Sequence, residues 1–330
     1  MDTESCLRYG GKLEFIIMSL IISAVICTHN RAECLGASIQ SLVDQSMSRS
    51  RYEVIIVNNS STDSTKEVVE SFADANSLRL IFEPRLGLSH ARNTGWRSAR
   101  GRYVAYLDDD AIASPNWLSI IAETFEAVKP RPGCVGGKVD PIWEAPRPRW
   151  VSGDLMTCLT AIDWADTAQV LPDLNQKWLV GANIAFPVDV LAEVGGFVLG
   201  LDRAGKNLLS GGDVFLEKQI VKAGYTCYYQ PEMLVRHFTP RERLNQHWFM
   251  RRYYWQGLSD AAMQLIERPL SKRERISLVI SKLFNLLRSP VKIGNMIMPT
   301  YDPTRFTKKC FAIIEVGHII GLLGAVGKIE

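Results

Sequence analysis

The sequence predicts an α/β fold whose first half is a Rossmann-like parallel sheet. Short apolar and β-branched runs alternate there with segments of helical pattern, which is the order of parallel strands joined by crossover helices. Polar clusters follow three of these runs, at the sheet edge where such folds bind ligands. With 330 residues, 47% of them hydrophobic, the chain is long enough to bury one large core or two modest ones.

Five strands are predicted in this half, at Ala24–Cys27, Glu53–Val57, Leu78–Phe82, Arg102–Leu107 and Cys134–Val139. The apolar run from Phe15 to Cys27 is too short to span a bilayer comfortably, and we interpret it as a buried first strand rather than as a signal peptide. The sequence leaves open whether translation starts at Met1 or at Met18.

Capping residues and glycines set the expected boundaries of the other elements. Ser64-Thr65-Lys66-Glu67 predicts a capping box that opens a helix, and Ser114-Pro115 predicts a helix with proline in its first turn. In the second half the pattern predicts a strand at Trp178–Phe186, a short helix at Asp189–Val194 ended by Gly195-Gly196, and a helix at Asp213–Ala223 ended by Gly224.

Three consecutive aspartates, Asp108, Asp109 and Asp110, follow the fourth predicted strand. Placing them together is costly unless a cation neutralises their charge. In strand geometry Asp108 and Asp110 point to the same side, so both can address one ligand. Carboxylate oxygens suit Mg2+ or Mn2+, which keep positions open for diphosphate oxygens. The alternative is a solvated acidic turn, which is the commoner origin of such a run, although the preceding apolar strand argues against it.

Two further polar loops are expected at the same edge of the sheet. Thr28-His29-Asn30-Arg31 follows the first predicted strand, and Asn58-Asn59-Ser60-Ser61 follows the second. Because the carboxyl ends of parallel strands meet at one edge, these loops should converge with the aspartates.

The second half contributes Gly211-Gly212-Asp213 at a helix start and His237 after an apolar run. An aspartate at a helix N-terminus is most often a cap, and a lone histidine is most often surface or core. The flanking glycines favour a functional Asp213, because they let a substrate approach the backbone closely.

The order of these motifs resembles the family 2 glycosyltransferases, which have the GT-A fold. The resemblance runs from Ser23 to Gly257. Each motif is weak alone, but their joint order is specific. The matching segments are V-I-C-T-H-N-R (Val25–Arg31), E-V-I-I-V-N-N-S-S-T-D (Glu53–Asp63), G-L-S-H-A-R-N-T-G (Gly87–Gly95), Y-L-D-D-D (Tyr106–Asp110), G-A-N-I-A-F (Gly181–Phe186), G-G-F (Gly195–Phe197), G-G-D-V-F-L (Gly211–Leu216), A-G-Y (Ala223–Tyr225) and P-E-M-L-V-R-H (Pro231–His237).

The resemblance implies a nucleotide-sugar donor and a divalent ion, Mn2+ or Mg2+. By it, Asp108 lies near the donor ribose, Asp110 and His237 hold the metal, and Asp213 is the general base. The implied reaction is a single displacement that inverts the anomeric centre and transfers the sugar to an acceptor hydroxyl, in cell-surface glycan or exopolysaccharide assembly. The donor-binding residues that it implies are Thr28, Asn30, Arg31, Asn58, Arg92, Asp108, Asp109, Asp110 and Asn183.

Two departures from the family pattern affect these expectations. Asn58 stands where the family usually has an aspartate that contacts the nucleotide base. An asparagine side chain can both donate and accept hydrogen bonds, so the sequence does not determine which base the donor carries. The usual acidic pair before the acceptor helix is Gly212-Asp213 here, which leaves Asp213 as the lone candidate base. Arg251 and Arg252 could assist the leaving group, but amphipathic surface arginines are the commoner explanation.

The expected organisation is an N-terminal extension at 1–22, a nucleotide-sugar-binding half at 23–140, an acceptor-binding and catalytic half at 141–257, and a basic amphipathic helical tail at 258–330. From Arg236 to Glu330 the chain holds 16 Lys and Arg against 7 Asp and Glu. Without an arginine-rich run or a nucleic-acid motif, this charge predicts no nucleic-acid partner. It favours peripheral contact with the cytoplasmic membrane face and a glycan or lipid-linked acceptor. The alternative is a pair of helices that pack on the catalytic domain or on a second subunit.

Two other functions are left open by the residues. A sugar nucleotidyltransferase shares the sheet and the acidic metal site, but it normally begins with a glycine-rich phosphate loop, whereas Val25–Arg31 contains no glycine. A catalytically silent sugar-binding scaffold is the second alternative. The scattered cysteines form no C-x-x-C pair, so a reducing cytoplasm is the expected location.

Overall fold

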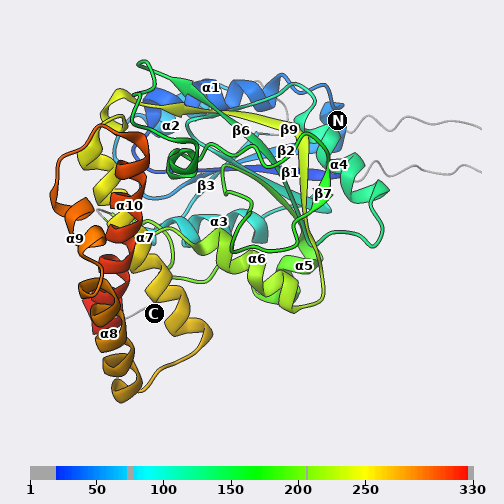
Figure 1. Ribbon diagram of the computed structural model, residues 1–330. Coiled ribbons are helices and arrows are strands. Elements are labelled where there is room, and N and C mark those ends of the chain that lie inside the picture. The colour runs from blue at the N-terminus through cyan, green and yellow to red at the C-terminus, as the bar shows by residue number, and fades with distance from the viewer. Residues whose placement is uncertain (1–19, 73–77, 206, 326–330) are drawn as a thin grey trace, which may run out of the picture.

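The computed structural model describes residues 20–72, 78–205 and 207–325, and it shows an α/β body with a group of helices beside it (Figure 1). Most of the predicted N-terminal extension lies outside the described residues. The strands are β1 (Ile22–Thr28), β2 (Tyr52–Asn58), β3 (Leu78–Phe82), β4 (Tyr103–Asp108), β5 (Ala111–Ala113), β6 (Cys134–Trp143), β7 (Gln169–Val170), β8 (Asn183–Pro187) and β9 (Cys227–Thr239). The helices are α1 (Ala32–Val43), α2 (Thr65–Glu70), α3 (Leu88–Arg97), α4 (Trp117–Ala127), α5 (Val188–Val194), α6 (Gly212–Lys222), α7 (Gln246–Glu267), α8 (Lys272–Leu287), α9 (Pro290–Ile297) and α10 (Pro303–Ile320).

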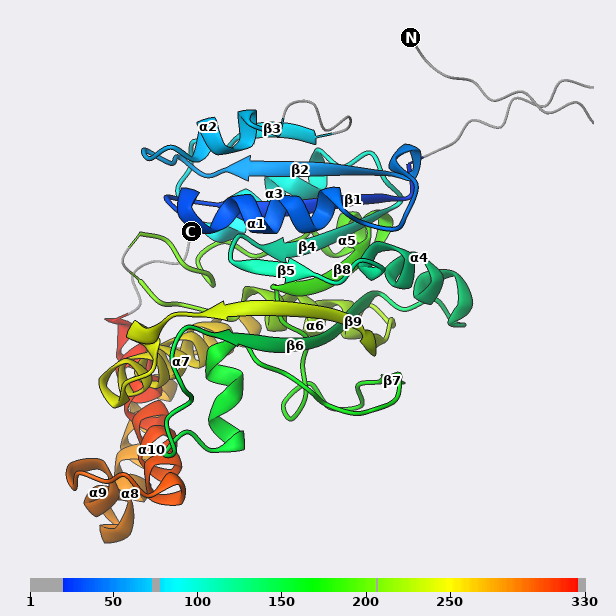
Figure 2. The ribbon, with the colours of Figure 1, turned by 90° about the horizontal axis from the view of Figure 1, so that it is seen from above.

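Within the described residues, nine strands form one sheet, with β7 paired to β9 beside the main order β3-β2-β1-β4-β8-β6-β9-β5. The strands β3, β2, β1 and β4 are parallel, and β8 runs antiparallel to both β4 and β6. The strand β9 is parallel to β6 and antiparallel to the short β5. Figure 2 shows the strands side by side and the C-terminal helices beyond one edge of the body.

The sheet lies between two layers of helices because its central strands are apolar on both faces. Alternate residues such as Ile26 and Ile56 pack in one core with Leu35 of α1 and Trp117 of α4. Their neighbours, such as Val25, pack in a second core with residues of α3, α5 and α6. Figure 1 shows α1 and α2 on one side of the sheet and α3, α5 and α6 on the other. The predicted α/β fold is therefore confirmed.

The five predicted strands of the first half are present, with β6 extended to Trp143. The predicted end of α5 is also confirmed, because Gly195 follows it with a left-handed φ of 89°. Gly224 follows α6 with a φ of 94°.

Three predicted details of the element ends are wrong. The helix α2 begins after Ser64 as predicted, but the Ser64 side chain makes no capping bond. Instead Asp63 Oδ1 accepts from Thr65 N at 3.1 Å and from Thr65 Oγ1 at 2.6 Å. Pro115 lies before α4 rather than in its first turn, in a turn closed by a bond from Trp117 N to Ser114 O.

The third error concerns the strand predicted at Trp178–Phe186, which begins only at Asn183. Two amides of the preceding segment donate to carboxylates of α6 instead of to a neighbouring strand. Leu179 N donates to Glu217 Oε2 at 3.0 Å, and Gly181 N donates to Asp213 Oδ2 at 2.9 Å. These bonds hold the segment as a loop over the start of α6.

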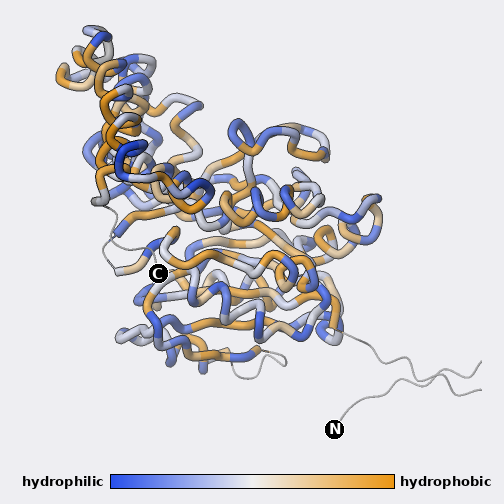
Figure 3. Tube along the Cα trace, turned by 90° about the horizontal axis from the view of Figure 1, so that it is seen from below, coloured by the Kyte–Doolittle hydropathy of each residue, from blue (hydrophilic) through white to orange (hydrophobic). Residues whose placement is uncertain are grey.

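The C-terminal helices pack on one another through glycine. An added Cβ on Gly257 of α7 would lie 2.1 Å from Ile314 O of α10, and one on Gly317 would lie 2.1 Å from Tyr254 O. Two glycines therefore allow α7 and α10 to cross in backbone contact. The helices α8 and α9 extend away from the sheet, and apolar stretches run along this group (Figure 3). None of the helices in the described part of the chain is long and apolar enough to span a bilayer.

Candidate active site

A cavity of about 1320 Å³ opens beyond the carboxyl ends of β1 and β4. Its lining includes Thr28 and Arg31 after β1 and the aspartates at the end of β4. It continues past the start of α6 and along α7 as far as Ile314 of α10. The predicted convergence of the loops after β1, β2 and β4 is therefore present, since Asn59 of the β2 loop also lines the cavity. The cavity also reaches the C-terminal helices.

Asp108, Asp110 and His237 meet at one side of this cavity. The short strand β5 pairs antiparallel with β9, which places His237 opposite Ala111 in the register. His237 Nε2 lies 3.1 Å from Asp110 Oδ1 and 3.6 Å from Asp108 Oδ2. One potential ligand atom from each of the three residues lies within 4.8 Å of the others, so together they can surround one ion.

The charges of this cluster are strongly coupled. Burial opposes a charge on His237, but Asp110 and Asp108 outweigh burial and raise the pKa of His237 to about 9. Burial would raise the pKa of Asp110, but His237 and Arg31 hold it well below its usual range. Burial, followed by the negative charge of Asp110, raises the pKa of Asp109 to about 7. The negative charge of the carboxylates in this cluster thus exceeds the single positive charge that the His237 imidazole can carry.

Three arginines approach the carboxylates of the cavity. Arg31 Nη2 forms a close ion pair with Asp110, and Arg243 Nη2 lies 3.9 Å from the same carboxylate. Arg92 is buried, with Nη1 3.5 Å from Asp202 Oδ2 and Nη2 4.0 Å from Asp108 Oδ1.

Asp202 is a residue that the sequence analysis missed. Its carboxylate accepts from Ser89 Oγ at 2.9 Å and from Gly212 N at 3.2 Å. Burial raises its pKa, and the charge of Arg92 opposes that rise. The only sequence signal is its place in a polar loop shortly before Gly211-Gly212, and nothing in that loop marks it as buried.

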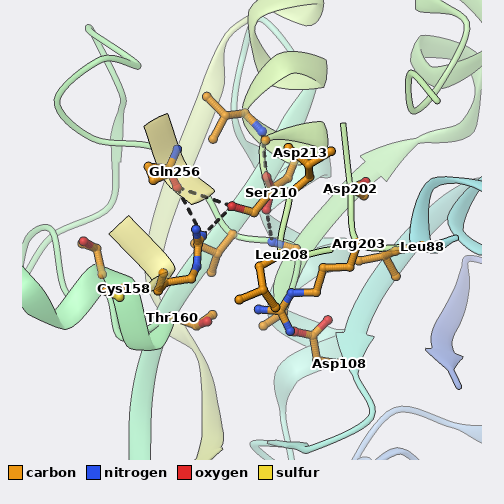
Figure 4. A pocket seen from close by; sticks show the side chains of 18 of the residues that line it. Leu88, Asp108, Cys158, Thr160, Asp202, Arg203, Leu208, Ser210, Asp213 and Gln256 are labelled. Carbon is orange, nitrogen blue, oxygen red and sulfur yellow. Dashed lines mark hydrogen bonds between the residues drawn. The ribbon is translucent and has the colours of Figure 1, made fainter. Parts of the chain in front are cut away.

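Asp213 lines the cavity from the first turn of α6, where Gly211 rather than Asp213 is the N-cap residue. Asp213 Oδ2 accepts from Gly181 N and Oδ1 accepts from Val214 N, each at 2.9 Å. A Cβ on Gly212 would lie 2.2 Å from Asp202 Oδ2, so this close approach requires glycine. Figure 4 shows Asp213 and Ser210 next to each other, with Asp108 around the same cavity.

The predicted donor-binding residues separate into two groups. Thr28, Arg31, Arg92, Asp108, Asp109 and Asp110 line the cavity, whereas Asn30, Asn58 and Asn183 do not. Asn30 Oδ1 accepts from Thr62 N, and Asn58 Oδ1 accepts from Ser61 N. Both side-chain amides therefore bind the backbone of the loop that follows β2.

Asn183 is fully buried. Its Oδ1 accepts from Trp117 Nε1 at 2.8 Å, and its Nδ2 donates to Met233 O at 2.7 Å. Because both ends of this side-chain amide are bonded within the body of the protein, Asn183 is not available to a ligand in the cavity.

The two adjacent arginines of α7 lie in different environments. Arg252 lines the cavity, whereas Arg251 is exposed and lies off it.

Among the relatives that a comparison with known proteins gives, the following two each match more than four fifths of the chain. A glucosyl-dolichyl phosphate glucuronosyltransferase from Haloferax volcanii is 27% identical over 280 residues, which are 82% of this chain and 88% of the relative. The succinoglycan biosynthesis protein ExoM from Rhizobium meliloti is 27% identical over 318 residues, or 93% and 94% of the two chains.

Solved structures share the fold. The mannosyltransferase PcManGT from Pyrobaculum calidifontis, solved in complex with GDP-Man and Mn2+, matches with a TM-score of 0.62 and 18% identity, over 92% of this chain and 86% of that one. The family described as glycosyl transferase family 2 matches residues 23–193, which are more than half of the chain. With the GT-A fold and the convergent aspartates, this match shows that the chain belongs to glycosyl transferase family 2.

Proposed function

We propose that this glycosyltransferase is a metal-dependent, inverting enzyme that transfers a sugar from a nucleoside-diphosphate donor to an acceptor hydroxyl in glycan assembly. The observation that carries the proposal is the convergence of Asp108, Asp110 and His237 in a cavity that Asp213 also lines. The relatives named above, a glucuronosyltransferase and a succinoglycan biosynthesis protein, support glycan assembly as the process.

The residues fit a divalent ion. Two carboxylates and one imidazole offer hard oxygens and a nitrogen within 4.8 Å, a donor set that suits Mn2+ with Mg2+ as the alternative. His237 would bind through Nε2, which already faces both carboxylates. When bound, such an ion would stabilise the negative charge of a departing diphosphate. Because His237 must be neutral to coordinate, metal binding would release its proton.

The roles proposed for the protein's own residues follow from their positions. Arg31 and Arg243 flank Asp110 and would contribute positive charge toward a diphosphate. The amides of Gly181 and Val214 orient the Asp213 carboxylate. Asp213 would accept the proton of the acceptor hydroxyl as that oxygen bonds to the anomeric carbon and the bond from this carbon to the diphosphate oxygen breaks.

The acceptor is proposed to be a glycan or a lipid-linked glycan presented at the cytoplasmic membrane face. The exposed face of α8 supports this proposal, since Ile280 and Phe284 are 60% and 57% exposed. Lys282 lies on the same helix and Arg288 follows it, so apolar and basic side chains occur together, as in helices that bind anionic membrane surfaces. The first relative described above acts, by its name, on a dolichyl-phosphate-linked sugar.

The proposal is tested by incubating the full chain with a panel of UDP- and GDP-sugars in Mn2+, in Mg2+ and in excess chelator. We expect slow hydrolysis of one donor with release of its nucleoside diphosphate, since water can replace a missing acceptor. Chelator should abolish the release, and added metal should restore it. Hydrolysis at an undiminished rate in chelator would refute metal dependence, and the absence of hydrolysis and of nucleotide binding across the panel would refute the proposed function.

A further inference from the structure

Arg252 of α7 is a half-buried cation whose hydrogen bonding is incomplete. Its Nη2 forms a close hydrogen bond to Ser210 Oγ and donates to Gln256 Oε1 at 3.2 Å. Its Nη1 is buried and has no hydrogen-bond partner. Among the ion pairs of the described residues, none joins Arg252 to a carboxylate, whereas Arg31 and Arg92 each pair with an aspartate. Its hydrogen-bond partners are therefore neutral oxygens, and the carboxylates of Asp213 and Asp260 act on it only from beyond ion-pair distance.

A second cation lies near it. Arg203 lines the same cavity and likewise forms no ion pair within the part of the chain that the structure describes. Figure 4 shows Arg203 in the region between Ser210 and Asp108. Burial and the positive charge of Arg203 both lower the pKa of Arg252. The positive charges of these two residues, which line one cavity, thus repel each other, and an anion bound between them would relieve that repulsion.

Holding a guanidinium out of water without a carboxylate costs several kcal/mol in general. A position that served packing alone would avoid this cost with an apolar or neutral side chain of similar size. We propose that Arg252 and Arg203 form an anion subsite on the acceptor side of the cavity, occupied by an acidic group of the acceptor. This inference rests on the proposed function.

The position of Arg252 assigns the anion to the acceptor rather than to the donor diphosphate. Arg252 bonds to Ser210, which directly precedes Gly211-Gly212-Asp213, the segment that carries the proposed base. The metal-binding residues instead have Arg31 and Arg243 beside them. A cavity of about 1320 Å³ also exceeds the roughly 300–1,000 Å³ of typical small-molecule sites, which leaves room for an acceptor next to the donor.

The ligand class follows from the guanidinium group. Its planar fork of N–H donors matches the oxygens of a phosphate or a carboxylate. Two kinds of acceptor supply such an oxyanion near the reacting hydroxyl: a sugar linked to a lipid phosphate, and a glycan that contains a uronic acid. Either oxyanion would accept a hydrogen bond from Arg252 Nη1, which lacks a partner in the structure.

The experiment is calorimetric titration of the full chain after its donor site has been filled with Mn2+ and UDP or GDP, whichever binds. Farnesyl phosphate and methyl β-glucuronide are then titrated separately as the phosphate and carboxylate probes. We expect one of them to form a 1:1 ternary complex. Arg252→Gln should weaken that complex by about tenfold or more, the scale of losing a charge-assisted hydrogen bond. Arg251→Gln, on the same helix but off the cavity, is the matched control and should bind as the wild type does.

Arg203→Gln provides a second variant, since Arg203 is exposed and its loss should not disturb folding even if Arg252→Gln proves unstable. This variant should bind the same probe more weakly, while its affinity for the nucleotide stays unchanged. The inference is overturned if neither probe binds to the nucleotide-filled protein. It is also overturned if the variants lower the affinity for the nucleotide instead of the affinity for the probe, because the arginines would then belong to the donor site. Nucleotide binding without probe binding refutes this subsite alone. Loss of all nucleotide binding refutes the proposed function and this inference with it.

Discussion

His237 and Asp110 face each other across the pairing of β5 with β9, with Nε2 of the histidine 3.1 Å from Oδ1 of the aspartate. The backbone fixes this contact, because Phe238 N donates to Asp110 O at 2.9 Å. His237 therefore lies on β9, and Asp110 lies in the two-residue turn between β4 and β5, which this backbone bond fixes to β9. A site fixed in this way keeps its geometry before an ion arrives.

Asp110→Asn should abolish metal-dependent donor binding. The substitution removes one of two carboxylates around the proposed ion and leaves the positive charges of Arg31 and Arg243 unbalanced. Calorimetric titration with Mn2+ and UDP or GDP measures the effect. Asp44→Asn is the control, since Asp44 is exposed and lies off the cavity. Wild-type affinity in Asp110→Asn would exclude Asp110 as a metal ligand.

Asp213→Asn should lower turnover by roughly 100-fold or more, the usual scale for losing a general base, with little change in nucleotide affinity. The asparagine keeps an oxygen that can accept from Gly181 N, so the loop over α6 should stay in place. The assay compares transfer rate, nucleotide affinity and melting temperature. Normal turnover together with a lower melting temperature would show that Asp213 only orders that loop.

His318 should make the stability of the protein pH-dependent between pH 6.5 and about 4. Burial and then the charge of Lys282 lower its pKa from 6.5 to about 4 in the folded state. The unfolded chain therefore binds a proton first as pH falls, so stability that is fully present above pH 6.5 is lost progressively toward pH 4.

Urea unfolding of the wild type and His318→Gln across this range measures the contribution. The variant should lose less free energy of unfolding on acidification, whereas the control His247→Gln, at an exposed position of α7, should behave as the wild type does. Parallel pH profiles for the wild type and His318→Gln would contradict the prediction.

Gly257→Ala should destabilise the packing of α7 on α10 by about 1–3 kcal/mol, the usual cost of overpacking. The new methyl group would lie 2.1 Å from Ile314 O, so the helices must separate. Gly294→Ala in α9 is the matched control, because no heavy atom lies within 4 Å of its added Cβ. Equal denaturant midpoints for the two variants would show that the crossing tolerates the methyl group.

Replacing Ile280 and Phe284 together with serine should weaken binding of the full chain to anionic vesicles. Both side chains are more than half exposed, so their loss removes apolar surface available to a membrane without opening the core. Each basic residue near an anionic surface contributes about 1 kcal/mol, so wild-type binding should also fall as salt rises.

Flotation with anionic and neutral vesicles measures this binding, and Val221→Ser, an exposed apolar position on α6, is the control. If neither the wild type nor the double variant floats, the membrane role is excluded. A concentration-dependent dimer that the double variant loses would instead assign this face to subunit packing.

The sequence alone determined the strands of the parallel half and the aspartates at its rim. Those features are local: apolar runs bounded by polar residues form buried strands, and the carboxyl ends of parallel strands share one edge. His237 and Asp213 could be named because their motifs occur in a family order. Asn183 belonged to the same order, yet its buried amide bonds to Trp117 and Met233. The family motif therefore identified the residue's position in the chain, but it did not indicate whether the side chain points into the cavity.

Only the tertiary structure decided which charges are balanced. Asp202 became part of the site because Arg92 comes to it from a distant segment and the amide of Gly212 binds its carboxylate. Arg251 and Arg252 are equivalent as neighbours in sequence, but the rotation of α7 leaves the first exposed and brings the second to the cavity. Whether a charge is paired depends on the groups within a few ångströms of it, and those groups are brought together by sheet pairing and helix packing, which local sequence does not specify.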